Sequence, residues 1–231
     1  MDVKILQLLD GARVADGVTV IIDVFRAFSF EAYMFSMGVE RIFPTASVEF
    51  AKGMKKRNPD YILAGERGGK IIDGFDIGNA PSDLHKLSLC GRCAVHTTSA
   101  GTQGIDNAKN ADLILGASLV NARATAEFIR KSGADKVSLV CMGLAAKEPT
   151  DEDTLCARYI KSILCGGDID MKKEIEALKL TSGAKFFDKN QSDVFPEADF
   201  YMCTDVDKFD FVMKYTRGEC GVGFMRKEIV R

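Results

Sequence analysis

Short apolar runs alternate with longer amphipathic stretches along the first two thirds of the chain. The run Val18–Ile22 is almost continuously apolar, which is typical of a strand that is covered on both faces. Further runs of this kind stand at 41–44, 61–64, 94–98, 113–116 and 137–141. Between these runs, apolar residues recur with the spacing of an amphipathic helix at 29–37, 47–56, 121–132 and 152–164. The alternation predicts an α/β fold, a three-layer α/β/α sandwich with a largely parallel or mixed central sheet.

The last third of the chain has a different pattern. A charged helix is expected at 171–179, and a strand-like run stands at 200–203. No Pro/Gly/Ser-rich linker separates this part from the preceding segments, and the sequence contains no internal repeat. We therefore expect a single domain over residues 1–231.

Charge is nearly balanced, because 31 lysines and arginines stand against 33 aspartates and glutamates, for a net charge of −2. This balance argues against a nucleic-acid or membrane-surface partner, so anions must be bound by a few local cations. Apolar residues make up 46% of the chain, which argues against wholesale disorder. No apolar run reaches the roughly 18–20 residues of a membrane span, and the first residues do not form a signal peptide. We expect a cytoplasmic protein.

Seven cysteines, an odd number, predict reduced thiols rather than a disulfide framework. Cys90 and Cys93 have the spacing of a metal or redox pair, but no second pair accompanies them, and we expect a structural role. Cys220 and Arg226 fit the C-x5-R spacing of a thiolate phosphatase, although little chain follows to form the activating helix. Residues 65–70 are not a Walker A loop, and no GxGxxG follows a strand.

Polar clusters recur where the expected strands end, and open α/β sheets bind ligands at that edge. Asp23 closes the first run and is followed by Arg26, whereas Glu66 and Arg67 stand beside glycines after the run at 61–64. Carboxylates are ligands for divalent cations, and arginine binds phosphate, sulfonate or carboxylate groups. For Asp23 and Arg26 a helix cap with an ion pair explains the residues equally well.

Two loops and one helix start add to this set. The segment 97–104 is rich in hydroxyl groups and glycines, which suits a phosphate if the following helix points its N-terminus there. Asp76 stands beside glycine in a tight loop, where a simple turn former explains it as well, and Asp153 stands in a first helical turn, where acids complement the helix dipole. Together these acids and arginines indicate a Mg²⁺-assisted anion site. We assign no role to His85 or His96.

Five segments resemble, in the same order, the successive motifs of the 2-phosphosulfolactate phosphatase family. They are 22–29 (IDVFRAFS), 64–69 (AGERGG), 74–81 (GFDIGNAP), 97–104 (TTSAGTQG) and 152–157 (EDTLCA). The resemblance covers about the first two thirds of the chain. It implies a three-layer α/β/α fold and a Mg²⁺-dependent phosphatase that converts 2-phospho-3-sulfolactate to sulfolactate and phosphate, a step toward coenzyme M.

The resemblance also implies roles for the matching residues. Catalytic roles are expected for Asp23, Arg26, Glu66 and Arg67. The expected metal ligands are Asp23, Glu66, Asp76 and Asp153. The expected substrate-binding residues in these segments are Ser99, Ala100, Gly101 and Thr102. Outside the segments, Asn121 is also expected to bind substrate, and Lys70 and Arg123 stand in loops where they would add positive charge.

Several alternatives stay open at this point. The chain could hydrolyse another small anionic phosphoester, or it could be a non-catalytic module that binds anions without a metal. Attack by water and a covalent route through Asp23 or Ser99 are both compatible with the sequence. The partner expected in each case is a small anion, and homodimerisation is left undecided.

Overall fold

The computed structural model describes residues 1–218 and 221–230. The strands are β1 (Asp2–Gln7), β2 (Gly17–Ile22), β3 (Arg41–Pro44), β4 (Ile62–Arg67), β5 (Lys70–Ile71), β6 (Cys93–Thr97), β7 (Ala111–Ala117), β8 (Lys136–Cys141), β9 (Phe211–Thr216) and β10 (Phe224–Ile229). The α-helices are α1 (Leu8–Val14), α2 (Ala27–Ser36), α3 (Val48–Arg57), α4 (Gly101–Asn107), α5 (Ala122–Ser132), α6 (Asp151–Cys165), α7 (Met171–Leu178) and α8 (Glu197–Cys203). Four 3₁₀ turns are described: η1 (Pro81–Lys86), η2 (Leu119–Asn121), η3 (Ala184–Phe187) and η4 (Lys189–Gln191).

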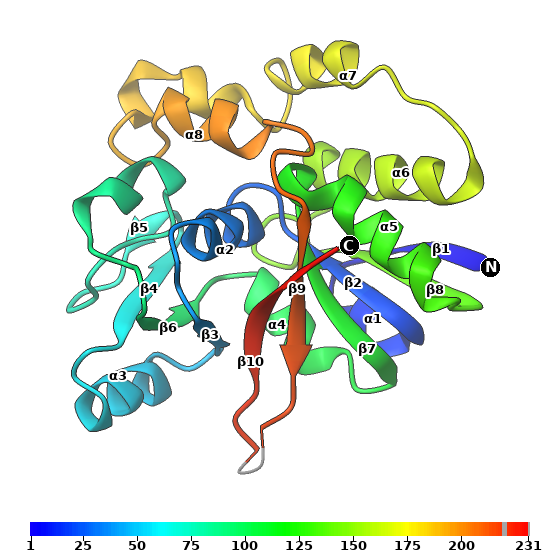
Figure 1. Cartoon of the computed structure of the whole chain (residues 1–231). Helices are drawn as coiled ribbons and strands as arrows, with labels where there is room; N and C mark the ends of the chain where they lie inside the picture. The colour runs from blue at the N-terminus through cyan, green and yellow to red at the C-terminus, as the bar shows by residue number, and fades with distance from the viewer. Residues whose placement is uncertain (219–220, 231) are drawn as a thin grey trace.

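The strands form one mixed sheet in the order β1-β8-β2-β7-β9-β10-β3-β6-β4-β5. Strands β1, β8, β2 and β7 pair in parallel, and so do β3, β6 and β4. The antiparallel pair β9–β10 joins these two blocks, and β10 pairs with β3 only at Met225 and Ile42. Figure 1 shows the sheet as strongly twisted.

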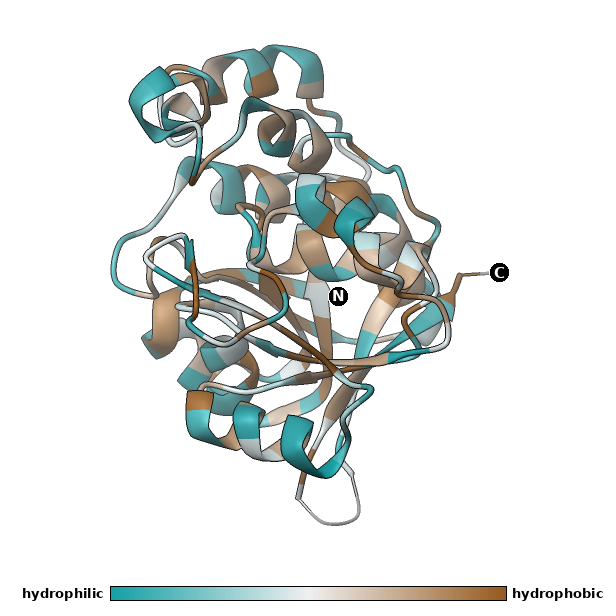
Figure 2. Ribbon diagram, turned by 90° about the vertical axis from the view of Figure 1, so that its left-hand side faces the viewer, coloured by the Kyte–Doolittle hydropathy of each residue, from teal (hydrophilic) through white to brown (hydrophobic). Residues whose placement is uncertain are grey.

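Helices cover both faces of the sheet, which confirms the predicted three-layer α/β/α sandwich. Helices α5 and α6 pack on the strands β7, β8 and β9, whereas α1 and α4 pack on β2 and β8 from the opposite face. In β2, Val20 and Ile22 face the α5–α6 side and Ile21 faces the α1–α4 side. Both faces of β2 are buried, which explains its continuous apolar run. In Figure 2 the strands are largely brown, and the outer surfaces of the helices are largely teal.

The strand-like run at 200–203 is a helix instead. It is the end of α8, which begins after Pro196 and carries Glu197 and Asp199 in its first turn. Proline at the start of a helix and acidic residues in its first turn are both favourable, whereas four apolar residues alone do not distinguish a strand from a helix. Figure 1 shows α7 and α8 together at the top of the molecule.

Strands β1, β9 and β10 were not expected from the sequence. β1 lies at the edge of the sheet and has Val3 as its one buried residue, and β10 carries charged side chains among its apolar ones and has Met225 as its one buried residue. Such half-exposed strands lack the continuous apolar run of a buried parallel strand. Within the described residues, no helix combines the length and the apolar character that crossing a membrane requires.

The two histidines and the Cys90–Cys93 pair, to which we assign no catalytic role, lie at the following places in the fold. His85 is exposed in η1, and His96 is buried in β6 with its Nδ1 atom 2.8 Å from Oε1 of Glu31. Cys90 is exposed and Cys93 is half-buried, both as free thiols. Cys220 lies outside the described residues, so the proposed C-x5-R loop is described only at Arg226, which lies in β10.

Candidate active site

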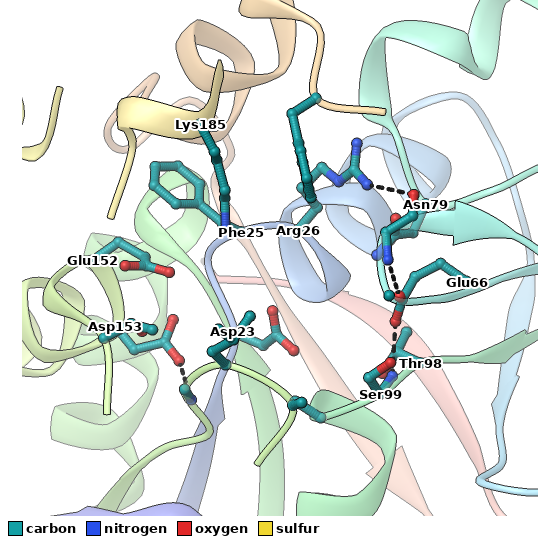
Figure 3. A pocket seen from close by; sticks show the side chains of 18 residues that line it. Asp23, Phe25, Arg26, Glu66, Asn79, Thr98, Ser99, Glu152, Asp153 and Lys185 are labelled. Atoms are coloured by element: carbon teal, nitrogen blue, oxygen red, sulfur yellow. Dashed lines mark hydrogen bonds between the residues drawn. The ribbon is translucent and has the colours of Figure 1, made fainter. Parts of the chain in front are cut away.

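A cavity of about 220 Å³ lies where β2, β4, β6 and β8 end, facing residues 184–203, which we term the cap segment. Carboxylates line its floor, and the cap segment contributes a cation and an aromatic side chain (Figure 3). The residues that carry its chemistry are Asp23, Arg26, Glu66, Asn79, Thr98, Ser99, Ala100, Glu152, Asp153 and Lys185, with Phe25 and Phe195 as apolar walls.

Asp23 follows the last residue of β2 and is 7% exposed. Its Oδ1 accepts a hydrogen bond from Ala27 N at 3.2 Å, and its Oδ2 accepts one from Gly101 N at 2.9 Å. Gly101 begins α4, and a Cβ at this position would lie 3.0 Å from Oδ2 of Asp23. The absence of a side chain at Gly101 therefore allows the loop after β6 to approach the end of β2.

Glu66 holds two other loops in place. Its Oε1 accepts a hydrogen bond from Ser99 N, and its Oε2 accepts one from Gly69 N, both at 2.8 Å. Ser99 belongs to the loop after β6, and Gly69 to the turn between β4 and β5. Because each carboxylate oxygen has a second lone pair, Glu66 keeps acceptor capacity toward the cavity.

Asp153 stands in the first turn of α6, and it connects two further strand ends. Its Oδ1 accepts from Val24 N, one residue after Asp23, and its Oδ2 accepts from Gly143 N in the loop after β8, each at 2.8 Å. Gly143 has φ +64, a left-handed conformation that glycine adopts without steric penalty. The three carboxylates thus fix the loops that surround the cavity.

Burial and mutual repulsion make these carboxylates difficult to ionise together. Burial, together with the negative charges of Glu66 and Glu152, raises the pKa of Asp23 to about 6. Burial also raises the pKa of Asp153 well above its usual range, and Glu152 and Asp23 raise it further. The pKa of Glu152 is raised by burial, while the charge of Lys185 acts in the opposite direction. The cluster therefore carries more negative charge than its surroundings neutralise.

The two basic residues of the cavity differ in what they contact. Arg26 is 3% exposed and donates from Nη1 to Val194 O and to Oδ2 of Asp199, both at 2.8 Å, and from Nη2 to Gly69 O at 3.1 Å. Lys185 lies over aromatic rings and forms no salt bridge within the described part of the chain. Neither cation is paired with a carboxylate of the cavity floor.

Comparison with known proteins gives the family of this chain. A family model described as 2-phosphosulpholactate phosphatase matches residues 3–218. The chain belongs to the 2-phosphosulfolactate phosphatase family. This is a family of phosphoric monoester hydrolases, and the match continues to residue 218, well beyond the last of the sequence motifs.

Relatives with this description span nearly the whole chain. A probable 2-phosphosulfolactate phosphatase of Bacillus subtilis (strain 168) is 34% identical over 200 residues, which is 85% of this chain and 86% of the relative. Another, from Clostridium acetobutylicum, is 30% identical over 224 residues, covering 90% of this chain and 93% of the relative. A third, from Clostridium perfringens, is 26% identical and covers 91% of both chains.

Most of the site residues expected for this phosphatase family come together at the cavity. Asp23, Arg26, Glu66, Ser99, Ala100 and Asp153 line it, and Gly101 contacts Asp23 through its backbone. Thr102 lies behind them, fully buried, where its N–H and its hydroxyl group bond to Thr98. These positions lie at or just beyond the carboxyl end of a strand, or in the first turn of a helix.

Asp76 is not brought to this cavity. Its Oδ2 accepts hydrogen bonds from Leu63 N at 2.7 Å and from Lys55 Nζ at 3.0 Å, so the carboxylate closes a turn against β4. Asn121 is also elsewhere, fully buried, with Oδ1 accepting from Ser118 N in a capping box around η2. Both side chains satisfy local backbone groups, which is the usual role of Asp and Asn in turns.

The other predicted cations also lie outside the cavity. Arg67 donates to Glu66 O, Ala46 O and Thr97 Oγ1, so it connects neighbouring segments. Arg123 pairs with Asp207 and donates to the hydroxyl of Tyr159. Lys70 lines a separate, neighbouring cavity.

Four of the cavity residues named above were not selected from the sequence, namely Asn79, Thr98, Glu152 and Lys185. Glu152 directly precedes Asp153 and was treated as an ordinary acid of a first helical turn. Asn79 belongs to the third motif segment, and its Oδ1 is buried without a hydrogen-bond partner among the described residues. Lys185 stands among aromatic residues in the last third of the chain, and no spacing signal connects it to the motifs.

The donor set of the cavity suits a hard divalent cation. Within residues 1–218 and 221–230, no three His, Cys, Asp or Glu side chains are grouped to hold a metal ion by themselves. Mg²⁺ needs no such group, because it usually keeps several waters and binds one or two carboxylates together with substrate phosphate. Oε2 of Glu152 is buried and has no hydrogen-bond partner in the described residues, so it is available as a ligand.

Proposed function

We propose that this chain hydrolyses the phosphate ester of 2-phospho-3-sulfolactate, giving sulfolactate and inorganic phosphate, with Mg²⁺ as its cofactor. The proposal places the product on the branch that leads to coenzyme M. One observation supports it above the others: four carboxylates surround one small cavity and have no paired cation there. A phosphoester that carries two further acidic groups cannot bind beside them unless a cation intervenes.

Candidate ligands for this cation are Asp23, Glu66, Glu152 and Asp153, all of which present oxygen atoms to the cavity. When bound, Mg²⁺ supplies positive charge that neutralises carboxylate and phosphoryl oxygens and polarises the phosphorus centre. The backbone N–H groups that fix Asp23, Glu66 and Asp153 hold these side chains in place before substrate arrives, and such preorganisation lowers the barrier to phosphoryl transfer.

Direct attack by water is the route that these contacts favour. Both oxygens of Asp23 accept hydrogen bonds from backbone N–H groups, which lowers their nucleophilicity toward phosphorus. A carboxylate of the cavity that does not bind the cation can accept a proton from the attacking water. The protein would therefore orient and deprotonate water rather than form a phosphoenzyme.

The test is phosphate release from racemic 2-phosphosulfolactate by purified protein, first treated with EDTA and then supplied with Mg²⁺. We expect no release in EDTA, full recovery with Mg²⁺, and one sulfolactate per phosphate by mass spectrometry. Release that persists in EDTA would contradict the role of the metal. Equal turnover of 2-phospholactate, which lacks the sulfonate, would favour a phosphatase for other small phosphoesters.

A further inference from the structure

Lys185 extends from the cap segment toward the carboxylates of the cavity (Figure 3). Its Nζ atom lies 5.2 Å from the ring centroid of Phe195, 5.5 Å from that of Phe186 and 5.7 Å from that of Phe25. Among the described residues, the ammonium group forms no salt bridge and no hydrogen bond. It is held by ring faces, which attract a cation without neutralising its charge.

Arg26, the other basic residue of the cavity, is already engaged. Three of its N–H bonds go to protein acceptors, namely Val194 O, Asp199 and Gly69 O. Its charge is balanced by Asp199, a fully buried carboxylate. Of the two cations that line the cavity, Lys185 is therefore the one whose charge stays available to an anionic ligand.

We infer that Lys185 binds the sulfonate group of the substrate and makes the enzyme prefer sulfonated phosphoesters. The inference rests on the proposed function and adds to it the residue that determines specificity. With the phosphate beside the carboxylates and their cation, the sulfonate would extend toward the cap segment, where Lys185 lies. A tetrahedral sulfonate with three oxygens matches an ammonium with three N–H donors, whereas a planar carboxylate is better matched by a guanidinium fork.

The aromatic surroundings support the same assignment. The side chains of Phe25 and Phe195 line the cavity beside Lys185, so an anion bound there loses much of its water. A sulfonate spreads its charge over three oxygens and is hydrated less strongly than a carboxylate, so it loses less free energy on entering this site. The attraction to Lys185 is in turn strengthened by the lower local dielectric constant.

The experiment compares kcat/KM of the wild type, Lys185→Met and Lys189→Met on 2-phosphosulfolactate and on 2-phospholactate, with Mg²⁺ present. Lys189→Met is the matched control, because it removes the same charge from an exposed position of the same cap segment. For Lys185→Met we expect a loss of about 10- to 100-fold on the sulfonated substrate, the range for a lost charged hydrogen bond. The loss of kcat/KM on 2-phospholactate should be at least tenfold smaller than on the sulfonated substrate, and circular dichroism checks that the variant is folded.

Other outcomes separate the inference from the proposed function. Equal losses on both substrates, or no loss on either, would overturn the inference and leave the proposed function intact. A wild type that releases phosphate from neither substrate would overturn the proposed function and the inference with it. A calorimetric titration adds a binding readout: sulfolactate should bind the wild type and Lys189→Met alike and bind Lys185→Met at least tenfold more weakly. Equal sulfolactate affinity in all three proteins would contradict the inference.

Discussion

The guanidinium of Arg26 and the carboxylate of Asp199 form a buried ion pair, with Nη1 of Arg26 2.8 Å from Oδ2 of Asp199. The two residues are 173 positions apart, one after β2 and one in the first turn of α8. Oδ1 of Asp199 also accepts a hydrogen bond from Ser82 N at 3.0 Å. The arginine that the motifs present as an anion ligand thus holds the cap segment over the cavity.

Replacement of Asp199 by alanine should therefore destabilise the protein strongly. The substitution leaves the buried guanidinium without its counter-charge and Ser82 N without its acceptor. Breaking a buried ion pair from one side typically reduces the free energy of unfolding by about 3–5 kcal/mol. Urea denaturation followed by circular dichroism measures this loss.

Asp193→Ala is the control, since Asp193 is an exposed carboxylate in the same cap segment. It should change the free energy of unfolding by no more than about 0.5 kcal/mol. Similar stabilities of the two variants would show that the Arg26–Asp199 pair does not hold the cap segment in place.

The buried carboxylates should make the metal-free protein less stable as the pH rises. The pKa of Asp23 is about 6 in the folded protein and close to 4 in an unfolded chain, so the folded state binds more protons between these values. Stability is then greatest below pH 4 for this group and falls as the pH rises toward 6, by about 3 kcal/mol. Thermal unfolding in EDTA, from pH 4 to pH 7.5, measures this decrease.

Added Mg²⁺ and the substitution Glu152→Gln should each reduce this loss of stability at higher pH. Added Mg²⁺ should stabilise the protein more at pH 7.5 than at pH 5, because protons and the cation compete for the same carboxylates. Glu152→Gln removes one negative charge and no hydrogen bond of Oε2, so the metal-free variant should be more stable than the wild type at pH 7.5. A variant that is no more stable there would show that repulsion within the cluster is weak.

The substitution Asp76→Asn tests whether Asp76 is a metal ligand or a residue that closes a turn. The carboxylate accepts from Leu63 N and Lys55 Nζ, so the substitution should lower the free energy of unfolding by about 1–2 kcal/mol. The Mg²⁺ concentration for half-maximal activity should be unchanged, because the side chain lies outside the cavity. A large increase in that concentration would instead support Asp76 as a metal ligand.

Gly101→Ala should disturb Asp23 directly. The new Cβ would lie 3.0 Å from Oδ2 of Asp23 and 3.2 Å from Cβ of Ala27, and both neighbours are well packed. We expect kcat to fall by at least tenfold and the free energy of unfolding to fall by about 1–3 kcal/mol. Gly53→Ala in α3 is the control, because its Cβ would meet only the end of Arg57 at 3.8 Å and should stabilise the helix.

Much of the fold follows from the sequence because burial on both faces gives parallel strands a continuous apolar run. Asp23 and Glu66 could be predicted for a related reason, since a carboxylate that follows such a run needs a polar environment, whereas Asp153 has the position of an acid in a first helical turn. Asp76 and Asn121 have the same sequence appearance, and only the structure shows that local backbone groups use their side chains. Lys185 could not be found, because its position over Phe25 and Phe195 depends on how the cap segment packs.

The central claim is tested most directly by phosphate release from 2-phosphosulfolactate, measured in parallel for the wild type and Glu66→Gln with Mg²⁺ and with EDTA. We predict rapid release by the wild type with Mg²⁺ only, and a rate lower by about 100- to 1,000-fold for Glu66→Gln. The amide of glutamine can accept from only one of the two N–H groups that Glu66 binds, and it lacks the charge that attracts the cation. Wild-type levels of release by Glu66→Gln, or no release by a folded wild type, would contradict the account.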